Sequence, residues 1–243
     1  MNGFWAALQF LTRLPTPPLR DYDDALAGRS ALYFPLVGLL MGLLLWGLAL
    51  LLGGAAPGVQ AALVLALWVG LSGGLHLDGL GDSADAWLGS HGDRQRSLEI
   101  MKDPRAGAAA VIAIGLLLIV KFAALQALLE NGQAVWLLLA PLLGRAASLA
   151  LFLTTPSARA DGAGATLSRH LPRRPAWGVL FVAALLPVLI LGTDGLWLLL
   201  ALLALGIALR RLMLQRLGGC TGDTAGALTE FSEAVALLVP ALI

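Results

Sequence analysis

Long apolar segments constrain this chain more than any other feature of its sequence. An α-helix needs about 20 mostly apolar residues to cross a bilayer, and six stretches meet or approach that length. Only 13% of the residues are charged, about half the share found in soluble domains. We therefore predict an all-α, polytopic integral membrane helix bundle that forms a single membrane domain over residues 1–243. The predicted spans are residues 31–53, 57–77, 107–129, 133–155, 176–192 and 195–209.

The two ends of the chain are less clearly spanning. Residues 228–242 are apolar but include Glu230 and Glu233, so they fit either a short span or a half-inserted helix. The predicted number of transmembrane helices is therefore six or seven. Residues 1–30 begin with apolar side chains on one side of a helix, a pattern typical of an amphipathic segment on a membrane surface.

The basic residues fall on one side of the predicted membrane. Of the 16 Lys and Arg residues, Lys121 and Arg145 lie inside predicted spans, and the other 14 lie in the N-terminal segment or in alternate loops. Cytoplasmic loops of membrane proteins are enriched in these residues, so we predict that these loops are cytoplasmic. They are residues 78–106, which are acidic and basic, residues 156–175, which are rich in Pro and Gly and predicted to be flexible, and residues 210–227.

Three aspartates follow the second apolar stretch directly. Asp78, Asp82 and Asp85 are spaced i, i+4, i+7, which places them on one face of a helix. No Lys or Arg follows until Arg94, so no local cation neutralises them. Mg²⁺ takes oxygen ligands and often needs only one or two carboxylates plus substrate phosphates. The pattern predicts a metal site, although a solvated acidic helix start is the simpler alternative.

A second acidic motif lies at residues 210–230. Asp223 and Glu230 are seven residues apart and share a helix face. Both acidic motifs lie on the predicted cytoplasmic side, so they are able to form one site.

Several cations and one histidine are candidate partners of that site. Lys102 and Arg105 precede a predicted helix start at Gly107, an arrangement that suits phosphate but also suits ordinary anchoring at the membrane surface. Arg145 lies near the middle of a span, where a charge costs about 2.5–3.5 kcal/mol, and is a candidate for a polar interior. His76 fits either a ligand-orienting role or a structural one.

Several common classes of protein are not indicated. The sequence contains no GxxxxGK[ST], HExxH or CxxC motif. It also shows no surface of interleaved aromatic and basic residues, so we predict no nucleic-acid partner.

Several motifs of the chain, taken together, resemble those of the cobalamin synthase family, the adenosylcobinamide-GDP ribazoletransferases. The resemblance rests first on two neighbouring motifs, GGLHLDGLGDSADA at 73–86 and RSLEIMKDPRAG at 96–107. Four further motifs match in the right order: FLTRLPTP at 10–17, YFPLVGLLMG at 33–42, PLLGRAA at 141–147 and GGCTGDTAGALTE at 218–230.

The resemblance implies a multi-pass enzyme of the bacterial cell inner membrane, with its active-site loops in the cytoplasm. Such an enzyme joins α-ribazole, or its 5′-phosphate, to adenosylcobinamide-GDP and requires Mg²⁺. The products are adenosylcobalamin, or its 5′-phosphate, and GMP. Its partners are these small molecules and the lipid bilayer, and a homo-oligomer is compatible with the sequence.

The expected roles follow from that chemistry. Asp82 or His76 is expected to act as the catalytic base, and Lys102, Arg105 and Arg145 are expected to bind phosphate. The expected metal ligands are Asp78, Asp82, Asp85, Asp223 and Glu230.

Three alternatives remain open. A CDP-alcohol phosphotransferase also uses spaced aspartates at a membrane face, but it expects Ala-Arg where this chain has Asp82 and Ser83. A prenyltransferase with aspartate-rich metal motifs is the second. A small-solute transporter would explain Lys121 and Arg145 inside spans, although the acidic cluster lies at the membrane face and not at its midplane.

Overall fold

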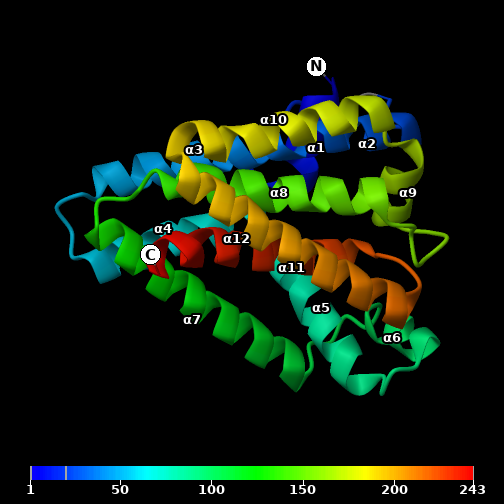
Figure 1. Cartoon of the computed structure of the whole chain (residues 1–243). Helices are drawn as coiled ribbons and strands as arrows, with labels where there is room; N and C mark the ends of the chain where they lie inside the picture. Colours follow the sequence, from blue (N-terminus) through cyan, green and yellow to red (C-terminus); the bar gives the residue numbers. More distant parts are fainter. Residues whose placement is uncertain (1, 20, 243) are drawn as a thin grey trace.

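The computed structural model describes residues 2–19 and 21–242, and these residues are almost entirely helical (Figure 1). Arg20, one of the loop cations counted above, lies outside the described residues. The helices of the first half are α1 (Asn2–Leu11), α2 (Asp24–Ser30), the 3₁₀-helix η1 (Ala31–Tyr33), α3 (Phe34–Leu51), α4 (Pro57–Ser72), α5 (Leu75–Gly89) and α6 (Arg94–Ile100). The helices of the second half are α7 (Ala108–Glu130), α8 (Trp136–Thr154), α9 (Ala163–His170), α10 (Arg173–Leu191), α11 (Thr193–Leu217) and α12 (Gly222–Leu242).

Six helical segments within the described residues are long and apolar enough to cross a membrane. They are the continuous segment Asp24–Leu51 and helices α7, α8, α10, α11 and α12. The prediction of an all-α polytopic bundle is therefore confirmed. Helix α12 begins at Gly222 and has 21 residues, so the last helix is longer than the apolar stretch 228–242 and is long enough to span.

The second predicted span, 57–77, is not one straight helix. Helix α4 ends at Ser72, helix α5 begins at Leu75, and the two meet at an angle of 85°. Gly73 (φ +61°) and Gly74 (φ +74°) both have left-handed backbone, a conformation that glycine adopts readily and that commonly ends helices. Helix α5 has 15 residues and three aspartates, so it is too short and too polar to cross by itself. We treat it as lying outside the membrane-spanning segments.

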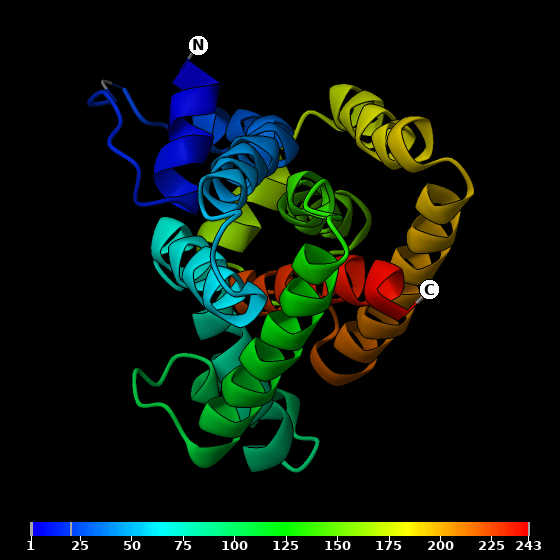
Figure 2. The ribbon, with the colours of Figure 1, turned by 90° about the vertical axis from the view of Figure 1, so that its left-hand side faces the viewer.

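Helix α8 lies at the centre of the bundle. It packs between α3, α10 and α12, as the view along the bundle shows (Figure 2). Small residues allow the close approach of α3 to α8. A Cβ atom at Gly38 would lie 2.3 Å from the carbonyl oxygen of Pro141, and one at Gly42 would lie 2.7 Å from that of Leu137. Helix α12 in turn packs against α5 and α7.

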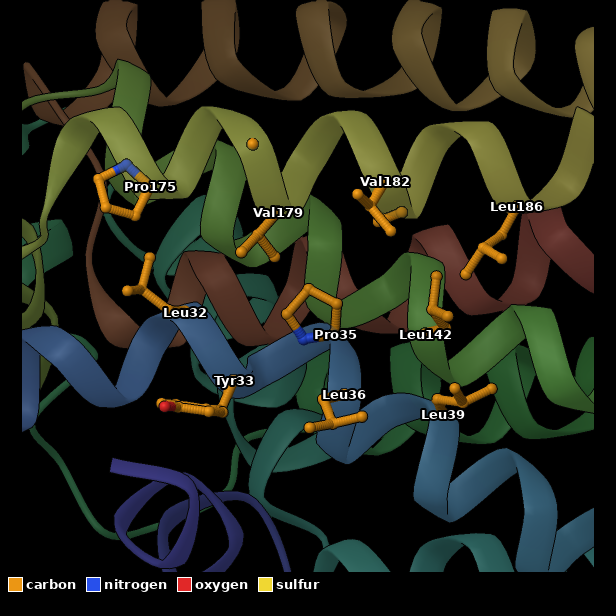
Figure 3. A pocket seen from close by; sticks show the side chains of 12 residues that line it. Leu32, Tyr33, Pro35, Leu36, Leu39, Leu142, Pro175, Val179, Val182 and Leu186 are labelled. Atoms are coloured by element: carbon orange, nitrogen blue, oxygen red, sulfur yellow. The ribbon is translucent and has the colours of Figure 1, made fainter. Parts of the chain in front are cut away.

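An apolar cavity of about 530 Å³ lies between α3, α8 and α10 (Figure 3). Leu36, Leu39, Leu142, Val182 and Leu186 are among the side chains that line it. Its lining is almost wholly hydrocarbon, so it offers little for charged chemistry.

The loops that carry the cations meet at one end of the bundle. Arg94 donates to the carbonyl of Ala158, Arg159 donates to that of Leu98, and Arg210 donates to that of Thr154. Residues 156–175, predicted to be a flexible loop, contain helix α9, which packs against α2. The shared end agrees with the alternation of charged and uncharged loops in the sequence.

Candidate active site

Backbone contact between α5 and α12 brings the two acidic motifs together. A Cβ atom at Gly79 would lie 2.7 Å from the carbonyl oxygen of Asp223, and one at Gly226 would lie 3.2 Å from that of His76. Because both positions are glycine, the first turns of the two helices touch. Asp78 of α5 and Asp223 of α12 consequently line the same pocket.

The carboxylates of this region influence one another. Partial burial, followed by the like charges of Asp78, Asp223 and Asp85, raises the pKa of Asp82 to about 6, and only Arg159 opposes the shift. A carboxyl group whose pKa is raised toward neutral pH by neighbouring acids is typical of a functional site or of a cation-binding site.

The pocket beside the acids also contains hydrogen-bond donors. It has a volume of about 90 Å³, and its lining includes His76, Asp78, Arg145, Ser148 and Asp223. Arg145 is 1% exposed, and its Nε atom is buried without a hydrogen-bond partner among the described residues. Its Nη2 atom lies 3.4 Å from Nδ1 of His76. Arg145, singled out because it lies inside a span, is thus next to the acidic site.

A cluster of ion pairs lies beneath this pocket, within the spans. Nζ of Lys121 lies 2.5 Å from Oε2 of Glu230 and 2.5 Å from Oε2 of Glu233, and Arg145 pairs with the other oxygen of Glu233. All four side chains are at most 6% exposed. Two cations and two carboxylates cancel, which makes their burial tolerable. Lys121 also lies over the ring of Trp68 at 4.9 Å.

This cluster gives Glu230 a different role from the predicted one. Glu230 is an ion-pair partner of Lys121 and is 4% exposed. It therefore faces the interior of the bundle, where Lys121 engages it, while Asp223 lies two helical turns earlier at the pocket.

Asp85 acts as a helix cap. Its carboxylate accepts hydrogen bonds from the backbone N–H groups of Gly107, at 2.6 Å, and Ala110, at 3.0 Å. Both oxygens therefore serve the unsatisfied donors at the start of α7. These two hydrogen bonds link α5 to α7, and they engage the carboxylate of Asp85, one of the predicted metal ligands.

Lys102 and Arg105 lie in the turn before α7. Both side chains are exposed. Arg105 pairs with Asp103 at 2.7 Å, and these hydrogen bonds lower the pKa of Asp103 to about 2. No hydrogen bond or ion pair links either cation to the α5 aspartates within residues 2–19 and 21–242, so their predicted phosphate contacts stay predictions.

Two side chains that take part in these ion pairs are not among the predicted site residues. Nη1 of Arg159 lies 3.3 Å from Oδ2 of Asp223, although the sequence places Arg159 in a loop predicted to be flexible. Glu233, which joins Lys121 to Arg145, was noted only as a charge in the last apolar stretch. No local pattern identifies either pairing.

The carboxylates near the pocket are the type of ligand that Mg²⁺ prefers. Across the described residues, no three His, Cys, Asp or Glu side chains lie close enough together to hold a metal by themselves. Mg²⁺ usually keeps several waters and takes one or two carboxylates plus phosphate oxygens. Asp78 and Asp223 line the pocket and both influence Asp82 through their charges, whereas Glu230 pairs with Lys121 and Asp85 caps α7.

The whole chain is similar to one family of known proteins. Residues 3–241 match the family model described as Cobalamin-5-phosphate synthase. Curated relatives called adenosylcobinamide-GDP ribazoletransferase, from Pseudomonas entomophila (strain L48) and Pseudomonas syringae pv. syringae (strain B728a), are 55% and 54% identical. Both comparisons cover 100% of each chain. A relative of the same name from Ectopseudomonas mendocina (strain ymp) is 56% identical over 97% of each chain. No solved structure matches the chain.

Proposed function

Because the chain belongs to the cobalamin-5-phosphate synthase family, we propose that it is an adenosylcobinamide-GDP ribazoletransferase. It joins α-ribazole, or its 5′-phosphate, to adenosylcobinamide-GDP and releases GMP. The observation that carries this proposal is the 55% identity over the full length of a relative with that name. The meeting of the two acidic motifs supports it, because transfer to a diphosphate calls for carboxylates that gather at one point.

Asp78, Asp82 and Asp223 would hold Mg²⁺ in this proposal. When bound, Mg²⁺ would neutralise the diphosphate of the donor substrate. Arg145 lines the same pocket, and its buried Nε has no hydrogen-bond partner among the described residues, which supports its role in holding a phosphate oxygen. Lys102 and Arg105 would contact phosphate from the exposed turn before α7.

Asp82 is the better of the two candidate bases. Before a cation binds, its pKa of about 6 suits proton transfer near neutral pH, and its carboxylate would take the proton on the oxygen that does not hold Mg²⁺. His76 is less suited, because a guanidinium can only donate: the contact of Arg145 with Nδ1 uses that lone pair and leaves the ring proton on Nε2. His76 would then orient a substrate oxygen by donating to it.

We place the enzyme in the bacterial inner membrane with the pocket on the cytoplasmic side. The support is the positive-inside distribution of the 14 loop cations. Both substrates would then reach the acids directly from the cytoplasm.

Separate Asp78→Ala and Asp82→Ala variants test the proposal. Each is expected to abolish GMP release from adenosylcobinamide-GDP while membrane insertion is retained. Asp161→Ala, which alters an exposed acid at the same end of the bundle, is the matched control and should keep wild-type turnover. Near-normal turnover in either variant would remove that carboxylate from the site. Solute flux in proteoliposomes without GMP release would favour the transporter instead.

A further inference from the structure

A second cavity lies at the same end of the bundle and is lined by arginines. It has a volume of about 520 Å³, within the range of small-molecule sites. Arg159 and Arg169 contribute to its lining from the segment between α8 and α10, and Arg173 contributes from the first residue of α10. No Asp or Glu belongs to its lining in the part of the chain that the structure describes. Three guanidinium groups around an acid-free cavity create a strongly anion-attracting space.

Several hydrogen-bond donors of this cavity have no acceptor among the described residues. Nε of Arg159 and Oγ of Ser168 are buried without any hydrogen-bond partner. Thr155 is 4% exposed, and its hydroxyl accepts from Nε of Arg210 at 3.1 Å. An arginine cannot accept, so the hydroxyl hydrogen of Thr155 is free to donate. Unsatisfied buried donors are costly, and here they share one space that calls for an acceptor-rich group.

The position of the cavity links it to the acidic pocket. Arg159 lines the cavity, and its guanidinium also pairs with Asp223 at 3.3 Å. Arg159 therefore forms the partition between an anion-attracting space and a carboxylate of the candidate metal site. The lining also includes the apolar residues Phe152 and Leu153. A ligand with a phosphate group and an apolar ring matches both parts of this lining.

We propose that the cavity lined by Arg159, Ser168, Arg169 and Arg173 binds the phosphate group of a nucleoside-phosphate substrate beside Asp223. Arg159, Ser168 and Thr155 donate to the phosphate oxygens, and Arg169 and Arg173 supply positive charge to the lining. The assignment rests on the proposed ribazole transfer only for the identity of the substrate. Phosphate binding itself follows from the donor set.

Equilibrium binding to the purified full chain in nanodiscs of neutral lipid tests the site without turnover. The probe is ribose 5-phosphate, with ribose as the uncharged comparison. Wild-type protein is expected to bind the phosphate ester and not ribose. Ser168→Ala and Arg169→Gln should each weaken binding about tenfold, the effect of one hydrogen bond to a charged group. The matched control is Arg174→Gln, because Arg174 is exposed and lies outside the lining.

Steady-state kinetics identify which substrate supplies the phosphate. If the acceptor supplies it, Ser168→Ala raises the KM for α-ribazole 5′-phosphate and leaves the KM for α-ribazole unchanged. If the donor supplies it, the KM for adenosylcobinamide-GDP rises with either acceptor. Equal affinity of wild type and both variants for ribose 5-phosphate would overturn the proposal. The proposal would also be overturned if the wild-type protein bound phosphatidylglycerol headgroups in nanodiscs but did not bind ribose 5-phosphate. A wild-type protein that binds ribose 5-phosphate but catalyses no ribazole transfer would overturn the enzymatic proposal alone.

Discussion

Replacing Glu233 by Gln tests whether the ion cluster within the spans stabilises the bundle through charge balance. The variant keeps the shape of the side chain but removes one of two carboxylates, so Lys121 and Arg145 are left to share Glu230. Removing one partner of a buried pair typically costs about 3–5 kcal/mol, because the other charge stays buried. Since each kcal/mol shifts Tm by about 2–4 °C in chains of this size, we expect an apparent Tm lower by roughly 6–20 °C.

The single cysteine provides the assay. Cys220 is 1% exposed, so a thiol-reactive fluorophore in detergent solution reports unfolding of the bundle as temperature rises. The decisive comparison is a double variant, Lys121→Met with Glu230→Gln. It removes one charge of each sign and leaves the pair of Arg145 and Glu233 intact. Replacing both members of a buried pair by uncharged groups is often nearly neutral, so the double variant should lose less stability than Glu233→Gln.

Two outcomes would refute this reasoning. The first is a Glu233→Gln variant that unfolds within about 2 °C of wild type, the shift expected for less than 1 kcal/mol. The second is a double variant whose loss of stability equals the sum of its two single substitutions. Such additivity would mean that the side chains do not interact.

Two further predictions concern the acids and the helix packing. Because protonated carboxyls do not bind metal, the pKa of about 6 at Asp82 predicts Mg²⁺ affinity roughly tenfold weaker at pH 5 than at pH 7; isothermal titration calorimetry measures it, and equal affinities at the two pH values would contradict the metal assignment. Gly38→Ala should destabilise the bundle by about 1–3 kcal/mol, since its Cβ would lie 2.3 Å from the Pro141 carbonyl oxygen. Gly47→Ala in the same helix meets no atom within 4 Å and is the control; equal thermal shifts in the two variants would refute the packing argument.

The sequence predicts most of the fold because hydropathy is a local property. Five of the six predicted spans correspond to apolar helical segments of the structure. The exception, 57–77, is broken in the structure: helices α4 and α5 are long and apolar enough to cross only when they are taken together as one bent pair. A window average counts Gly73 and Gly74 as ordinary residues, whereas their left-handed backbone turns the chain by 85°.

The candidate site could be predicted only in part. The i, i+4, i+7 spacing indicates which acids share a face of α5, but it does not say which of them already has a partner. Asp85 is engaged by the start of α7, and Glu230 is engaged by Lys121, 109 residues away in sequence. Pairings over such distances depend on how helices pack, and one sequence read locally carries no information about that.

The wide separation of Lys121 and Glu233 also has a consequence for biogenesis. The two residues are 112 positions apart, and ribosomes add about 5–20 residues per second. Roughly 6–22 s therefore pass between the synthesis of Lys121 and the synthesis of Glu233, its ion-pair partner. The 23 mostly apolar residues of α7 outweigh the lone ammonium, for which insertion costs about 2.5–3.5 kcal/mol, so α7 enters the bilayer unaided. A nascent chain cut before α12 would thus insert α7 into the bilayer but would lack the carboxylates that pair with Lys121 and Arg145. The bundle is therefore expected to complete its packing only after α12 is made.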